Sequence, residues 1–210
     1  MRARVVAAAI AAVLALSAGR AGAQELLEPP RPRQGYYVSL GAFALNSDTR
    51  EKGAWLKPWF GAAGALRGGQ LLTRRFALGM TIEEGRASGE GQTATIIGFG
   101  PEASFAVAGN LALRGGIGLG VVHLHDPNNP FESSTRGVTG ARFALGASYD
   151  IFLTRKDRSG GFALTPSVQL RLVPGGDTHG LYALVGIEAT YWLGLPRNQL
   201  ELSPDQAWKK

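Results

Sequence analysis

Residues 181–193 read Leu-Tyr-Ala-Leu-Val-Gly-Ile-Glu-Ala-Thr-Tyr-Trp-Leu, and this stretch decides the fold. Counted from Leu181, every second residue is apolar until Tyr191, whereas the alternate set is mixed and has Glu188 in its middle. A period of two predicts a β-strand whose two faces meet different surroundings. In a soluble sandwich the apolar face would look into a core. In a transmembrane barrel it would look out at lipid, and the polar face would line the interior.

The same alternation recurs upstream, giving eight alternating segments between Tyr36 and Leu193. The cleanest runs from Phe162 to Val173, where Phe, Leu and Val oppose Ala, Thr, Ser, Gln and Arg. The least regular, at about 57–72, contains Gly68-Gly69, which predicts a β-bulge. Helical periodicity is absent after the N-terminal region.

The connections between these segments alternate in length. Short ones are expected at 73–75, 108–110 and 154–160, and longer, more polar ones at 46–56, 84–92, 125–137 and 174–178. Short turns at one end and long loops at the other are typical of an outer-membrane barrel with both termini in the periplasm. We therefore predict an all-β, eight-stranded antiparallel up-and-down transmembrane β-barrel over residues 36–193. The alternative is an exported soluble β-sandwich or lipocalin-like binder.

The chain ends carry targeting and linker features. Residues 1–23 combine a basic start, an apolar run of about a dozen residues and an Ala-Gly-Ala cleavage site, which predicts a secretory signal peptide. Residues 24–35 contain three prolines and are expected to form an extended periplasmic leader. Residues 194–210 are expected to form a polar periplasmic tail.

Composition narrows the function classes. The chain has no cysteine, so it has no disulfide framework despite its expected export. Its formal net charge is +6, but the basic residues are dispersed, which argues against a nucleic-acid partner. We expect no cofactor.

Five aromatic residues lie on the apolar face near the short-turn end of their segments. In a folded barrel they would share one height and form a girdle at the inner membrane interface. In a soluble sandwich they would be core residues without a common height. The girdle candidates are Tyr36, Phe76, Phe105, Phe162 and Tyr191.

The polar face places charged and amide side chains inside the predicted barrel. An eight-stranded barrel has an interior that side chains just fill, and buried charges need partners. We therefore predict a structural ion-pair network that plugs the lumen; the alternative is a selectivity lining for a narrow conduit. The predicted network consists of Arg67, Glu83, Glu102, Arg114, Arg142, Asp150, Gln169, Arg171 and Glu188.

The chain resembles the small eight-stranded outer-membrane β-barrels of the OmpA/OmpX/OmpW-like group. The hairpins carry the resemblance: residues 71–78, 105–113 and the closing stretch 186–193. It implies location in the outer membrane of a Gram-negative bacterium, with outer-membrane lipids and the barrel-assembly machinery as partners. Such barrels often end at an aromatic residue of the last strand, whereas this chain continues, so an insertion signal within 186–193 is an assumption.

The function implied is a non-enzymatic one, structural, adhesive or interactive, through outer loops whose extracellular partner the sequence does not identify. Resemblance to the OmpW-like subset implies an alternative, passive transport or binding of a small, apolar ligand.

Lipid A-modifying enzymes also use this scaffold. His123, His125 and His179 lie near outer strand ends, with Glu132, Ser133 and Ser134 in a loop. Their residue types would suit a hydrolase, but no motif of such enzymes matches. No third ligand accompanies His123 and His125, so we expect neither a catalytic nor a metal site.

Overall fold

The computed structural model describes residues 33–51, 54–55, 58–89, 92–125, 136–153, 160–175 and 178–194. The expected signal peptide, most of the leader and the tail beyond Gly194 lie outside the described residues. Within the described residues, no helix is long and apolar enough to cross a membrane.

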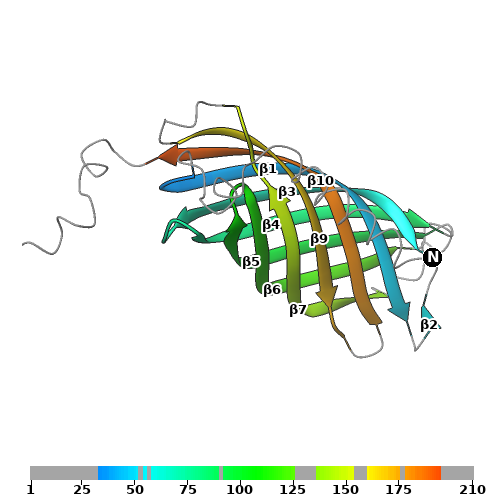
Figure 1. Cartoon of the computed structure of the whole chain (residues 1–210). Coiled ribbons are helices and arrows are strands. Elements are labelled where there is room, and N and C mark those ends of the chain that lie inside the picture. The colour runs from blue at the N-terminus through cyan, green and yellow to red at the C-terminus, as the bar shows by residue number, and fades with distance from the viewer. Residues whose placement is uncertain are drawn as a thin grey trace, which may run out of the picture.

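Ten strands form a single antiparallel sheet that closes on itself (Figure 1). They are β1 (Tyr36–Glu51), β2 (Ala54–Trp55), β3 (Trp59–Leu71), β4 (Phe76–Gly89), β5 (Gln92–Ala108), β6 (Leu111–His125), β7 (Arg136–Tyr149), β8 (Ile151–Phe152), β9 (Gly161–Val173) and β10 (Thr178–Gly194).

Two of the ten do not count as separate strands of the barrel wall; we call each of the eight that do a stave. The short β2 pairs only with β1, and β8 continues β7 along β9 in unchanged register. Because β1 pairs with both β10 and β3, the sheet has no free edge. The structure is thus a closed eight-stranded antiparallel β-barrel, which confirms the predicted fold class.

Cross-strand partners show how far the strands are staggered. From Asn46 on β1, the partners lead through β10, β9, β7, β6, β5, β4 and β3 and return to β1 at Tyr36, ten residues earlier. Such a stagger requires strands tilted by roughly 40° from the barrel axis. We call the end with Tyr36 and Gly194 the terminal end and the opposite one the distal end.

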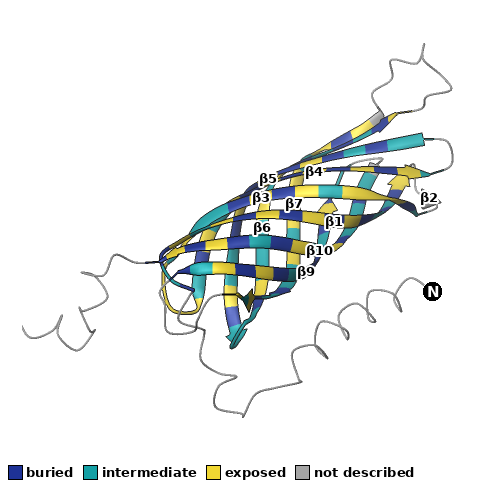
Figure 2. Ribbon diagram, turned by 90° about the horizontal axis from the view of Figure 1, so that it is seen from above, coloured by how far each residue is buried: buried dark blue, intermediate teal, exposed yellow. Residues whose placement is uncertain are grey.

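Burial alternates along each strand (Figure 2). On β10, Tyr182 and Glu188 are almost fully buried, whereas Ile187 and Leu193 are 56% and 61% exposed. The apolar set of each segment therefore points outward, and the mixed set fills the lumen. A soluble sandwich would show the opposite arrangement.

The predicted bulge at Gly68-Gly69 is wrong. Strand β3 keeps continuous register with β1 and β4 through both glycines. Gly69 instead makes room inside the lumen, together with Gly79 on the neighbouring strand: a Cβ on Gly69 would lie 2.8 Å from the Tyr37 ring, and one on Gly79 would lie 2.7 Å from the Tyr37 hydroxyl. Absent side chains here make room for an aromatic ring, not for an extra residue. The register shifts of the barrel lie in β1 and β5.

Two of the expected long loops are also wrong. Strand β1 continues to Glu51, and β4 and β5 are paired up to Gly89 and Gln92. Polar outward residues such as Asp48 and Arg86 suggested loops. Hydrogen bonds between the backbones of paired strands nevertheless keep these segments extended, because such bonds do not depend on the side chains. The distal end therefore bears extended β-ribbons.

Candidate functional site

The lumen holds the predicted polar residues, and nearly every stave contributes to it. Arg67 comes from β3, Glu83 from β4, Glu102 from β5, Arg114 from β6, Arg142 from β7, Asp150 from the β7–β8 junction, Gln169 and Arg171 from β9, and Glu188 from β10. Eight of these residues are buried. The ninth, Arg114, has a side chain that is 12% exposed.

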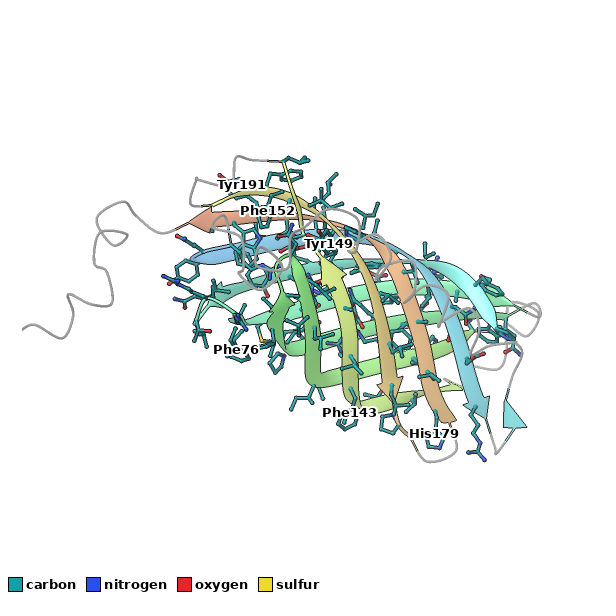
Figure 3. The ribbon with its side chains drawn as sticks, in the orientation of Figure 1. Phe76, Phe143, Tyr149, Phe152, His179 and Tyr191 are labelled. Carbon is teal, nitrogen blue, oxygen red and sulfur yellow. The ribbon has the colours of Figure 1, made fainter. Side chains whose placement is uncertain are left out.

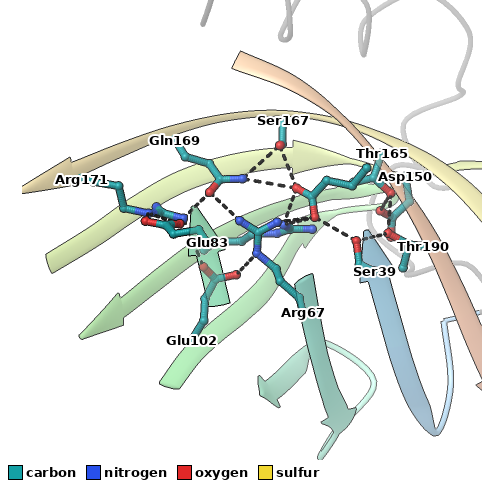
Figure 4. A network of polar contacts seen from close by, with 12 residues as sticks. Ser39, Arg67, Glu83, Glu102, Asp150, Thr165, Ser167, Gln169, Arg171 and Thr190 are labelled. Atoms are coloured by element: carbon teal, nitrogen blue, oxygen red, sulfur yellow. Dashed lines mark hydrogen bonds and ion pairs between the residues drawn. The ribbon is translucent and has the colours of Figure 1, made fainter. Parts of the chain in front are cut away.

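Glu188 is the centre of the first cluster, and its partners Ser39, Arg67 and Ser167 are labelled in Figure 4. Its carboxylate pairs with Arg67 at 2.6 Å and with Arg114 at 2.7 Å. The hydroxyls of Ser39 and Ser167 donate hydrogen bonds to it at 3.0 and 2.8 Å. Both carboxylate oxygens are thus saturated by donors, which is what a fully buried carboxylate requires.

Glu83 is the centre of the second cluster. It pairs with Arg142 at 2.5 Å and with Arg171 at 3.1 Å. The Tyr182 hydroxyl donates to it at 3.1 Å. A Cβ on Gly98 would lie 2.8 Å from both partners of the Arg142–Glu83 pair, so a larger residue there would displace these side chains.

Gln169 and Glu102 join the two clusters. The Gln169 amide oxygen accepts hydrogen bonds from Arg67, at 2.7 Å, and from Arg171. Glu102 pairs with the same two arginines at 3.1 and 3.6 Å. The predicted lumen residues other than Asp150 therefore form one connected set of eight across the lumen, which we call the polar layer.

Asp150 lies at the terminal end and is linked to Glu188 through the hydrogen-bonded hydroxyls of Thr165, Thr190 and Ser39. It pairs with Arg33 and accepts a hydrogen bond from the Thr165 hydroxyl at 2.9 Å. The Arg33 guanidinium also donates to the Asn110 carbonyl at 3.2 Å and lies 5.8 Å from the Trp192 ring. Sequence reasoning missed Arg33 because it precedes the first strand, in the predicted leader, where no alternation marks a face.

The distal part of the lumen is apolar, which sequence reasoning also missed. Inward residues there pack together instead of enclosing a polar channel; Leu184, for example, is 1% exposed. The missed signal was the apolar character of inward positions such as Tyr182 and Leu184 themselves. We call this cluster the apolar layer: Phe43, Leu45, Trp59, Ala65, Ala87, Ala94, Ile96, Val122, Leu124, Val138, Val173, Tyr182 and Leu184.

The five predicted aromatics lie on the outward face toward the terminal end. Phe76 is opposite Phe105, and Phe162 is opposite Tyr191. Tyr36 begins β1. Figure 3 shows Phe76 and Tyr191 toward one end of the barrel and His179 at the other.

The three histidines are not gathered into a site in the described structure. His123 and His125 lie opposite Thr95 and Thr93. His179 accepts a hydrogen bond from the Gly175 amide at 3.2 Å. The loop at 132–134, with the candidate acid and serines, lies outside the described residues. No group of three or more His, Cys, Asp or Glu that could hold a metal occurs in the described part of the chain.

Comparison with solved structures places this closed, staggered barrel among known ones. Ail, the attachment invasion locus protein of Yersinia pestis, superposes with a TM-score of 0.54 at 13% identity, covering 75% of this chain and 99% of Ail. Neisserial surface protein A superposes with a TM-score of 0.51 at 11% identity, covering 76% and 98%. The fold is that of the small outer-membrane β-barrels. No protein-family model and no curated protein sequence matches the chain.

Proposed function

We propose that this protein is a non-enzymatic integral outer-membrane barrel that presents its distal ribbons at the surface of a Gram-negative cell, in a structural, adhesive or interaction role. The observation that carries the proposal is the lumen, which is closed by two layers in series. One is the polar layer, a buried network of ion pairs, and the other is the apolar layer.

The outward surface supports the membrane location. Large apolar side chains such as Leu40, Leu119 and Leu145 are more than 60% exposed. In water a belt of this extent would cause aggregation, whereas acyl chains solvate it. The aromatics at the terminal end would form the inner interfacial girdle, and outer-membrane lipids would be the permanent partners.

The orientation follows from the same features. The terminal end carries the tight turns at 72–75 and 109–110, and the distal end carries the longer ribbons. In barrels of this class the short turns face the periplasm. Both chain ends would then be periplasmic, with assembly machinery acting on the closing strand β10.

The packed lumen argues against a conduit. Water and ions would have to pass the apolar layer, in which Leu45, Val122 and Leu184 are buried, and then the polar layer. Opening the polar layer means separating charges that have no solvent to replace their partners, which typically costs about 3–5 kcal/mol for one broken buried pair. Passive transport of a small apolar ligand is the second candidate, because a ligand that enters from the distal end would first meet the apolar layer.

Conductance in a planar bilayer separates these two candidates. We expect the purified protein to give no unitary current steps, with an open general porin at the same protein-to-lipid ratio as positive control. Reproducible steps, or uptake of a small apolar dye into proteoliposomes, would favour transport instead.

The interaction role is tested at the distal ribbons. Ser88 and Thr93 are paired beyond the apolar belt on β4 and β5. Replacing residues 88–93 by Asn-Gly would shorten this ribbon while leaving a favourable hairpin turn. We expect the shortened variant to lose binding of expressing cells to coated surfaces or host cells, whereas Thr73→Ala at the opposite end would retain it. Attachment is also what the name of Ail describes, although that likeness by itself shows only the fold.

The enzyme hypothesis has a direct test. We expect the lipid A of cells that express the protein to keep its mass. A mass change that disappears with His123→Ala or His179→Ala would replace our proposal by a hydrolase.

A further inference from the structure

The outward face of the barrel has a depression over β1, β3 and β4. It has a volume of about 520 Å³, and its lining includes Leu40, Leu66 and Ile82. The depression forms because small residues are paired at its base, with Ala42 opposite Gly64. Elsewhere on the outward face, large side chains such as Phe99, Leu119 and Leu145 are exposed.

Two charged side chains stand on the rim of this depression. Glu84 lies opposite Gly64, and Arg86 lies opposite Ala62. Both are exposed on the outward face of β4. Within the described residues neither side chain makes an ion pair or a hydrogen bond, with each other or with any neighbour.

Glu84 lies inside the apolar belt and not beyond it. Its partner on β5 is Ile97, which in turn lies opposite Val121 on β6. Because the strands tilt, this path leads toward the distal end, so apolar outward residues continue past the level of Glu84. A carboxylate facing acyl chains is costly and calls for a partner of opposite charge.

We propose that this depression is the interface with a second copy of the chain, in a twofold dimer in which Glu84 of each copy pairs with Arg86 of the other. A twofold axis brings residue i to j and residue j to i, so one acid and one base on the same patch are self-complementary. The small residues Ala42, Ala62 and Gly64 let the two backbones approach closely, as small residues do between membrane-embedded segments.

The depths of the two charges permit this pairing. Two copies inserted in the same direction place Glu84 at one depth and Arg86 two residues farther along the tilted strand, roughly 5 Å higher. A long arginine side chain spans that difference by bending toward its partner. A phosphorylated outer-leaflet lipid fits less well, since Glu84 would repel the phosphate that Arg86 attracts.

This inference rests on the proposed membrane location, so the test reads the two separately. Because the chain has no cysteine, Ala62→Cys introduces a single thiol at the proposed interface. We expect a short bis-maleimide to cross-link this variant into a dimer in liposomes. Leu119→Cys, on the outward face of β6, is the matched control and should stay monomeric. The heat-dependent shift in gel mobility of unboiled samples reports insertion and folding for each variant.

Charge reversal then tests the pairing itself. Glu84→Arg alone and Arg86→Glu alone should each abolish cross-linking at Ala62→Cys, and the double reversal should restore it, with the heat-dependent shift kept throughout. Folded Ala62→Cys protein that gives no cross-linked dimer would overturn the dimer and leave the barrel standing. So would single reversals that keep cross-linking, or that change only the amount of co-purified phosphorylated lipid. Loss of the heat-dependent shift in the unmodified protein would instead overturn the membrane location.

Discussion

Replacing Glu188 by glutamine tests whether the polar layer supports the barrel. The Glu188 side chain is 0% exposed and pairs with Arg67 and Arg114. Glutamine keeps the size and one carbonyl oxygen but removes the negative charge that both guanidinium groups face. Breaking a buried pair from one side typically costs about 3–5 kcal/mol, because the remaining charge is left uncompensated.

The structure says where that cost arises. Arg67 keeps contacts with Glu102, at 3.1 Å, and with Gln169, at 2.7 Å. Arg114 pairs with no other acid in the described part of the chain than Glu188. We therefore attribute most of the loss to Arg114 and expect Arg114→Met, combined with Glu188→Gln, to recover more than half of it.

The assay is reversible unfolding in detergent micelles or lipid vesicles, followed by tryptophan fluorescence and by heat-dependent gel mobility. Glu84→Gln, also a carboxylate-to-amide change but on the outward face, is the matched control and should leave stability unchanged or higher in a monomeric preparation. A loss below about 1 kcal/mol for Glu188→Gln would refute the reasoning, because it would mean that water or a rearranged neighbour already shields Arg114. Failure of Arg114→Met to restore stability would refute the attribution to that side chain.

Three further outcomes follow from the structure. Gly79→Ala should lower the free energy of unfolding by about 1–3 kcal/mol, since its Cβ would meet the Gly68 carbonyl at 2.4 Å and the Tyr37 hydroxyl at 2.7 Å. An unchanged urea midpoint for this variant would contradict the packing described for Tyr37. Arg33→Ala should raise the rate of proteolysis at the N-terminal side of the barrel without altering the heat-dependent shift, because Arg33 ties the leader to Asp150; equal proteolysis of both proteins would argue against that tie. Leu184→Ala should create a cavity in the apolar layer and lower the free energy of unfolding by about 2–4 kcal/mol, yet give no current steps in a planar bilayer. Current steps from this variant would show that the polar layer alone does not seal the lumen.

Much of the candidate site could be predicted because alternation assigns a face to each residue before the fold is known. Glu188 and Arg171 were expected inside for that reason, and both are at most 1% exposed. Their partners were not predictable. Which arginine meets Glu188 depends on the stagger between strands, and a period of two is unchanged when one strand slides past another by two residues.

The sequence by itself determined that the chain makes strands, how many staves the barrel has and which side of each faces outward, since these follow from local periodicity. Only the tertiary structure decided the ten-residue stagger, and with it the meeting of Arg67, Arg114 and Glu188 from three different strands. It also decided that the leader's Arg33 enters the lumen and that the distal lumen is apolar. These features depend on distances between residues far apart in the chain. Closure of the sheet sets those distances, and no local sequence pattern predicts them.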